Sequence, residues 1–197
     1  MHSIAEKIVN GSEYTVSEKL LPYEKNLKLL VSKIKSEYPE VVDTEYRFKI
    51  PISGIIKTDE KLAFSGFIDA IFKNEDSYQI VDWKTDRSQD YGAIHRQQLE
   101  AYKRAFCVAE GVKPEKVKVA IGFVGLRRAI NTGKIEAFLD NRQPQKTAFE
   151  TFSNKVQTIL DWKKDPNSFL KQLIEDSRSD DVLWRSIAEQ CKAEMVK

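Results

Sequence analysis

The sequence predicts an α/β or α+β domain, with a mixed central β-sheet flanked by helices and a helical C-terminal part. Segments rich in β-branched and aromatic residues alternate along the chain with segments of helical periodicity. The 197 residues, 41% hydrophobic and 31% charged, have the composition of a folded domain with a core of its own. We expect one domain over residues 1–197, with its core over residues 2–140 and C-terminal helices over 143–197.

The first elements are a helix and a strand. Residues 17–36 carry one apolar helical stripe, with Ser17 as the expected N-cap and Pro22 near the start. Residues 41–56 are rich in β-branched and aromatic side chains, and Tyr46, Phe48 and Ile50 fall on one side of the predicted strand. The stripe consists of Leu20, Leu27, Leu30, Val31 and Ile34.

A hairpin and a second helix follow. The apolar runs of "FSGFIDAIFKNEDSYQIVDWKTD", residues 64–86, are separated by a polar turn and should pair as antiparallel strands. Residues 91–111 then place apolar side chains at near-helical spacing until Gly111. These apolar positions are Ile94, Leu99, Tyr102, Ala105 and Phe106.

The remaining elements complete the sheet and the C-terminal part. Residues 117–126 predict a strand, and "GKIEAFLD", residues 133–140, predicts a weaker one. A helix with an apolar face is expected from Gln143 to Pro166. Another amphipathic helix, capped by Ser179 or Asp180, is expected to close the chain.

Composition limits the possible functions. The net charge of +2 does not by itself indicate a nucleic-acid partner, so such a surface has to be local. Cys107 and Cys191 are too few for a four-cysteine iron–sulfur cluster or zinc site, and they suit a reducing cytoplasm. The sequence contains neither a membrane-length apolar stretch nor a secretory signal pattern, so we expect a cytoplasmic protein without a membrane partner.

Acidic residues interrupt both strands of the hairpin. Alternation places Asp82 and Lys84 on one side of their strand, and Asp69 lies in the neighbouring strand. Two adjacent carboxylates in an apolar sheet require either solvent at the strand ends or a cation between them. The alternative is an ordinary charged pair of Asp82 with Lys84 and a turn at Asp69, because a D-x-K string is common by chance.

In combination, three motifs resemble the RecB-type nuclease domains of the PD-(D/E)XK superfamily, as at the C-terminus of RecB- and AddA-like helicases. They are Gly66-Phe67-Ile68-Asp69, then Asp82-Trp83-Lys84, then Gln98-x-x-x-Tyr102, and the likeness spans about residues 2–126. The resemblance implies a restriction-endonuclease-like core. It also suggests that "HSIAEKI" begins a helix whose His2 reaches the active site, as in a domain excised or shortened from a larger protein.

The resemblance implies a divalent metal site. It makes Asp69 and Asp82 ligands of Mg²⁺ or Mn²⁺, together with the Trp83 carbonyl and His2, whose imidazole would favour Mn²⁺. Lys84 would orient the attacking water and stabilise charge on the phosphate oxygens. Glu45 matches a Glu that would serve as an additional ligand or support the others.

Other residues are assigned around this site. Gln98 and Tyr102 share one helix face and could reach the site or the DNA, although Tyr102 suits a core position equally well. His95 is expected on a solvated helix face. Residues 113–134 contain six basic and one acidic side chain, a net charge of +5 that suits phosphates or merely a solvated face. The arginines expected to bind DNA are Arg96, Arg104, Arg127 and Arg128.

The function implied by the resemblance is a metal-dependent DNA nuclease. It would act as an exonuclease on single strands or DNA ends, in recombination or repair, beside a helicase motor in the same parent chain or in a separate subunit. The chain has no Walker A string and therefore no motor of its own. Two alternatives remain: an inactive DNA-binding or helicase-docking module of the same fold, and a standalone restriction-type endonuclease.

Overall fold

The computed structural model describes residues 1–127 and 133–176. They belong to two compact units, Met1–Glu150 and Thr151–Lys197, each described here by itself. Arg128, Cys191 and the helix expected after Ser179 lie outside the described residues. The division into one domain with a core and C-terminal helices stays a prediction.

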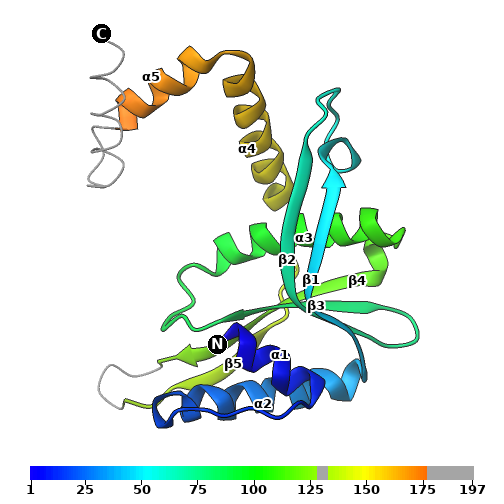
Figure 1. Cartoon of the computed structure of the whole chain (residues 1–197), viewed down its shortest axis with the longest axis vertical. Coiled ribbons are helices and arrows are strands. Elements are labelled where there is room, and N and C mark those ends of the chain that lie inside the picture. The colour runs from blue at the N-terminus through cyan, green and yellow to red at the C-terminus, as the bar shows by residue number, and fades with distance from the viewer. Residues whose placement is uncertain (128–132, 177–197) are drawn as a thin grey trace. The chain divides into compact units, whose positions relative to one another are not determined.

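The first unit is built on a mixed sheet, as predicted (Figure 1). Its strands are β1 (Glu40–Pro51), β2 (Ala63–Lys73), β3 (Tyr78–Lys84), β4 (Val117–Leu126) and β5 (Glu136–Asp140). They lie side by side in chain order, with β3 and β4 parallel and the other neighbours antiparallel. The parallel pair requires a crossover, and helix α3 (Gly92–Glu110) provides it.

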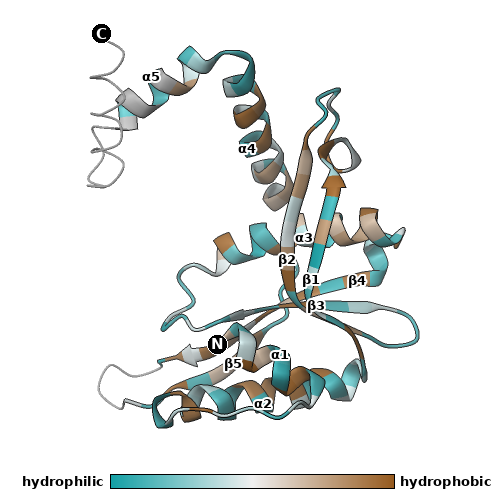
Figure 2. Cartoon of the chain, viewed as in Figure 1, coloured by the Kyte–Doolittle hydropathy of each residue, from teal (hydrophilic) through white to brown (hydrophobic). Residues whose placement is uncertain are grey.

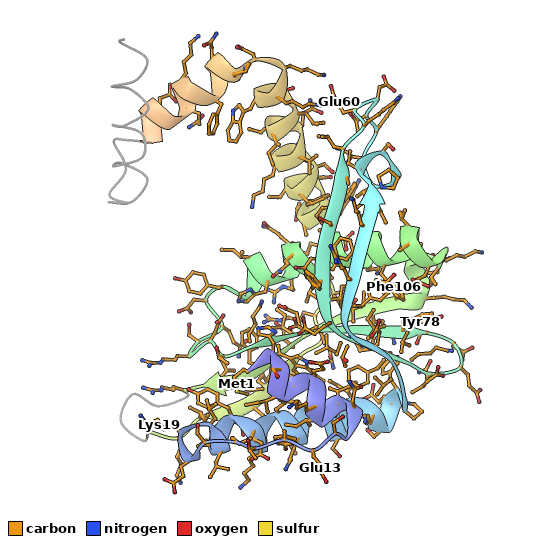
Figure 3. The ribbon with its side chains drawn as sticks, in the orientation of Figure 1. Met1, Glu13, Lys19, Glu60, Tyr78 and Phe106 are labelled. Carbon is orange, nitrogen blue, oxygen red and sulfur yellow. The ribbon has the colours of Figure 1, made fainter. Side chains whose placement is uncertain are left out.

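Helices cover both faces of this sheet, which is why its central strands are apolar on both sides. Helices α1 (His2–Asn10) and α2 (Leu21–Glu37) lie on one face and α3 lies on the other (Figure 1). Phe106 of α3 packs edge-on against Tyr78 of β3, with ring centroids 5.2 Å apart (Figure 3). On the opposite face, Leu27 and Val31 of α2 share a core cluster with Val81 and Trp83.

Helices lie where residues 17–36, 91–111 and 143–166 predicted them, but some details differ. Helix α2 begins at Leu21 with Pro22 in its first turn, and Ser17 makes no side-chain capping bond to it. Ser17 instead precedes a short 3₁₀ turn, Glu18–Leu20. Ile94 was expected in the apolar stripe of α3 but is 57% exposed.

The C-terminal helices are α4 (Lys146–Lys164) and α5 (Pro166–Asp176). Pro166 separates them by starting α5, which its fixed φ and missing N–H allow at a first helical position. Within the second unit, the rings of Trp162 and Phe169 are 5.0 Å apart. No helix among the described residues combines the length and hydrophobicity needed to cross a membrane.

The hairpin of β2 and β3 opens before its strands end. Its turn is held by Asn74, whose side-chain oxygen accepts hydrogen bonds from the backbone N–H groups of Asp76 and Ser77. Pairing runs from Lys73–Tyr78 to Ala70–Val81 and stops there. Beyond that point β2 stays paired with β1 alone as far as Pro51–Ala63, so the two strands leave the sheet as a ribbon (Figure 1). Glu60 lies near the tip of the connection that follows β1 (Figure 3).

Candidate functional site

The site forms where β2 separates from β3. If the antiparallel register continued, the next pair would be Asp69–Asp82, but the backbone ladder ends one step before it. Asp69 replaces that ladder with its side chain: Oδ2 accepts a 2.7 Å hydrogen bond from the backbone N–H of Trp83. The Trp83 side chain is buried, and its ring lies so close to Gly122 that a Cβ there would be 2.3 Å from Cε3.

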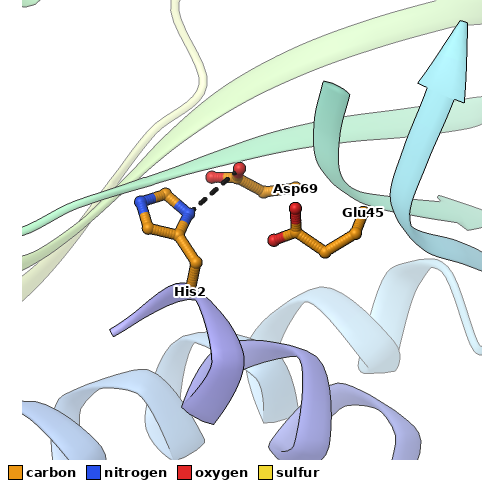
Figure 4. A group of neighbouring side chains, drawn as sticks. All are labelled: His2, Glu45 and Asp69. Atoms are coloured by element: carbon orange, nitrogen blue, oxygen red, sulfur yellow. Dashed lines mark hydrogen bonds and ion pairs between the residues drawn. The ribbon is translucent and has the colours of Figure 1, made fainter. Parts of the chain in front are cut away.

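Three side chains gather their ligand atoms at this opening (Figure 4). His2, Glu45 and Asp69 each offer one atom, and these atoms all lie within 4.8 Å of one another. His2 comes from the first turn of α1, and its Nδ1 is 3.1 Å from Asp69 Oδ1. The predicted role of His2 therefore has a geometric basis, and Glu45 is brought into the group itself.

Glu45 reaches the group through an unusual backbone. Its φ is +54°, the left-handed region that is uncommon for residues other than glycine. β1 also has a register shift between Val41 and Asp43, so the strand is irregular just before this position. Burial, and then the charge of Asp69, raise the pKa of Glu45.

Asp82 lies beside this group and pairs with Lys84. Its side chain is 6% exposed, and Oδ2 is 2.8 Å from Lys84 Nζ. Apart from this ion pair with Lys84, the buried oxygen has no hydrogen-bond partner among the described residues. Burial raises the pKa of Asp82 to about 6, although Lys84 acts to lower it. The predicted Asp82–Lys84 face is confirmed, because Val81 and Trp83 pack in the core under α1 and α2.

Gln98 and Tyr102 of α3 form a pair next to Asp82. Gln98 Nε2 donates a 2.7 Å hydrogen bond to the Tyr102 hydroxyl, and the Tyr102 ring packs edge-on against Phe48. Burial raises the pKa of Tyr102, and the charge of Asp82 raises it further. Gly66 makes room for this arrangement, since a Cβ there would lie 2.8 Å from Phe48 Cζ. Tyr102 thus combines a packed ring with a polar end near the acids.

The surroundings of His95 differ from the prediction. His95 does not lie on a solvated helix face: its side chain is only 15% exposed, and Nε2 is 2.7 Å from Asp86 Oδ2. Its ring also packs near Phe123, with centroids 6.2 Å apart. The one signal in the sequence was an acidic residue, Asp86, nine residues before His95 and just after the strand that carries Lys84.

The four arginines expected to bind DNA have different surroundings. Arg96 Nη1 is 2.7 Å from the buried Asp140, which Arg142 also contacts. The hydrogen bonds from Arg142 lower the pKa of Asp140, although burial acts to raise it. Arg104 pairs with Glu100 and lies 3.4 Å above the Phe149 ring. Arg127 is exposed at the end of β4, and Arg128 is outside the described residues. Of the three described arginines, Arg127 has its side chain most open to a phosphate.

The donor set suits a divalent cation. Carboxylate oxygens are the preferred ligands of Mg²⁺, and an imidazole nitrogen also suits Mn²⁺. Glu45 and Asp69 supply such oxygens beside His2. Asp82, which is paired with Lys84, lies close enough to this group that the charge of Asp69 helps to raise the Asp82 pKa. Coordination by Asp82 and by the Trp83 carbonyl stays a prediction.

Comparison with known proteins gives the family. The model of the PD-(D/E)XK nuclease superfamily matches residues 4–192, and the chain belongs to this superfamily. The assignment of Asp69, Asp82 and Lys84 to the motif of that name stays a prediction. Members are generally nucleases and typically use divalent metal ions.

No curated protein matches the chain. One similar solved structure, titled "Crystal structure of SSO0001", has 15% sequence identity and a TM-score of 0.38, over 79% of this chain and 85% of that chain.

Proposed function

We propose that this chain is a Mg²⁺- or Mn²⁺-dependent deoxyribonuclease of RecB type. The observation that supports it most is the junction of Asp69, Asp82 and Lys84 where β2 leaves β3, with His2 and Glu45 beside it. A divalent ion held by these acids would supply positive charge to the scissile phosphate and lower the pKa of a water.

The protein groups have distinct tasks in this proposal. Asp69 is oriented by the Trp83 N–H, which leaves Oδ1 facing His2. Lys84 is an ammonium with three N–H donors and no lone pair, so it acts as a donor to the water or the phosphate oxygens. Gln98 and Tyr102 present donors from α3 for the phosphate backbone.

The finer assignment rests on the resemblance of the motifs. We place the chain as an exonuclease module acting on single strands or DNA ends, with a helicase partner, in cytoplasmic recombination or repair. Arg127 would contribute a phosphate contact.

Cleavage assays test the proposal. Linear and closed circular substrates, single- and double-stranded, are incubated with the full chain and Mg²⁺, Mn²⁺ or EDTA, beside an RNA strand and the Asp82→Asn variant. Metal-dependent loss of linear single strands alone supports the exonuclease. Cutting of closed circles supports the standalone endonuclease, and DNA binding without any cleavage supports the inactive module.

A further inference from the structure

The ribbon formed by β1 and β2 has one buried and one open face. Phe48, Ile50 and Ile68 belong to the core cluster under α3. The residues between them point the other way, and β1 alternates accordingly between hydrophilic and hydrophobic residues (Figure 2). The open face carries Arg47, Lys49, Ser65 and Phe67, all exposed.

Phe67 is conspicuous on that face because its side chain is not used in the fold. It is 53% exposed, whereas its neighbour Ile68 is 0% exposed. Arg47 lies opposite Phe67 in the register and its Cζ is 5.9 Å from the ring centroid, so one side of the aromatic ring has a cation near it. Lys49 lies opposite Ser65, one step further out.

This face continues directly from the metal-ligand group. Glu45 and Asp69 lie opposite each other between the pairs Thr44–Ala70 and Tyr46–Ile68. Phe67 lies two residues before Asp69, at a distance of about 7 Å along the strand, since a strand rises about 3.3 Å per residue. A nucleotide next to a phosphate at the metal group is therefore within reach of the ring.

We infer that the open face of the ribbon is a subsite for single-stranded nucleic acid, in which a base stacks on Phe67 while Arg47 and Lys49 contact phosphates. An exposed aromatic ring flanked by cations is the arrangement that holds unpaired bases, because every base has a face to stack. A paired base is already stacked and does not offer that face, so the subsite selects unpaired over duplex nucleic acid. The inference rests on the proposed nuclease function and identifies the strand that this site takes.

Binding measurements test the subsite without relying on cleavage. Fluorescence anisotropy measures the binding of the full chain to labelled oligothymidylate, oligouridylate, an abasic strand and a blunt duplex in the presence of Mn²⁺. Every protein in these titrations also carries Lys84→Ala, which should prevent cleavage of the strands. Phe67→Ala should weaken oligothymidylate binding about ten-fold, as expected for loss of one stacked base, and Phe67→Trp should preserve it. Leu29→Ala, at a residue of α2 that is 61% exposed, is the control and should change nothing.

Two further outcomes separate stacking from charge. The abasic strand should bind equally to the parent and to Phe67→Ala, because it has no base to lose. The double variant Arg47→Ala, Lys49→Ala should reduce the slope of log affinity against log salt concentration by about 1.4, because each lost phosphate contact reduces it by about 0.7. Phe67→Ala should leave this slope unchanged.

The inference is overturned if Phe67→Ala binds oligothymidylate as the parent does, or if it weakens the abasic strand or the duplex equally. This failure differs from that of the proposed function. If the protein shows no cleavage but Phe67→Ala still weakens strand binding, the subsite stands and the nuclease function fails. If the protein cleaves but Phe67→Ala leaves strand binding unchanged, the nuclease function stands and the subsite fails.

Discussion

The backbone N–H of Trp83 donates a 2.7 Å hydrogen bond to the Asp69 carboxylate at the point where β2 and β3 stop pairing. One acidic side chain thus completes the hydrogen bonding of the opened strand and also faces the metal-ligand group. The same residue has a structural and a chemical role, and substitutions can separate the two.

Asp69→Asn should keep the metal-free protein as stable as the parent or make it more stable. The amide oxygen can still accept from Trp83, while one negative charge disappears beside Asp82 and Glu45. Asp69→Ala should instead lower the free energy of unfolding by about 1 to 3 kcal/mol, because the N–H loses its acceptor. Urea unfolding in EDTA measures both. A large loss of stability in Asp69→Asn would show that the charge itself is structural.

Lys84→Ala should reduce cleavage about 100-fold or more, as expected when a donor to transition-state charge is removed. Metal and strand binding should persist, because an ammonium has no lone pair and is not a metal ligand. Lys84→Arg should not restore cleavage, since a planar guanidinium cannot occupy the position of the ammonium.

Lys73→Ala is the matched control for Lys84. Lys73 is also a strand lysine. It lies away from the site, and its Nζ is 3.3 Å from Glu40 Oε1. If Lys84→Ala cleaves like Lys73→Ala, the Asp82–Lys84 pair is structural and the mechanism proposed here fails.

The stability of the metal-free protein should fall as pH rises from about 4 to about 6. Burial raises the folded-state pKa of Asp82 to about 6, against about 3.9 in an unfolded chain. Between these values the folded state binds a proton that the unfolded state does not, so the unfolding free energy decreases with pH. Mn²⁺ competes with that proton, so its affinity should rise over the same window.

Asp82→Asn provides the comparison for this pH dependence. Thermal unfolding in EDTA and calorimetric titration of Mn²⁺, both across pH 4 to 8, should give flatter profiles for the variant. Equal slopes in parent and variant would assign the titration to another group.

His2→Ala should weaken Mn²⁺ binding about ten-fold or more while leaving the fold intact. The His2 side chain is 57% exposed and its contact with Asp69 is made at the surface, so little packing is lost. The other histidine gives the control: His95→Ala breaks the pair with Asp86 and should change Mn²⁺ affinity much less. Unchanged affinity in His2→Ala, measured by calorimetry, would remove His2 from the metal group.

Gly66→Ala should destabilise the protein by about 1 to 3 kcal/mol, because the added methyl group meets the buried Phe48 ring. The displacement should also disturb Tyr102, which packs on the same ring. Ser65→Ala, at the exposed neighbouring position, should leave the melting temperature near that of the parent. Equal melting temperatures for both variants would mean that Phe48 can move freely.

The sequence predicted what depends on local periodicity. Alternation in "IVDWK" was enough to place Asp82 and Lys84 together, and the polar turn was enough to pair the two strands antiparallel. Long-range partners leave no such local trace. Asp140 is 44 residues from Arg96, so their ion pair was invisible and Arg96 was read only as a phosphate ligand.

The left-handed backbone at Glu45 has a consequence for engineering. A glycine would take up this conformation without strain, and a method that selects residues by backbone preference would replace Glu45 early. The resulting variant would gain stability and lose a carboxylate from the cluster with His2 and Asp69. Attempts to make this protein more heat-resistant should therefore hold position 45 fixed, because stability and chemistry make opposite demands on it.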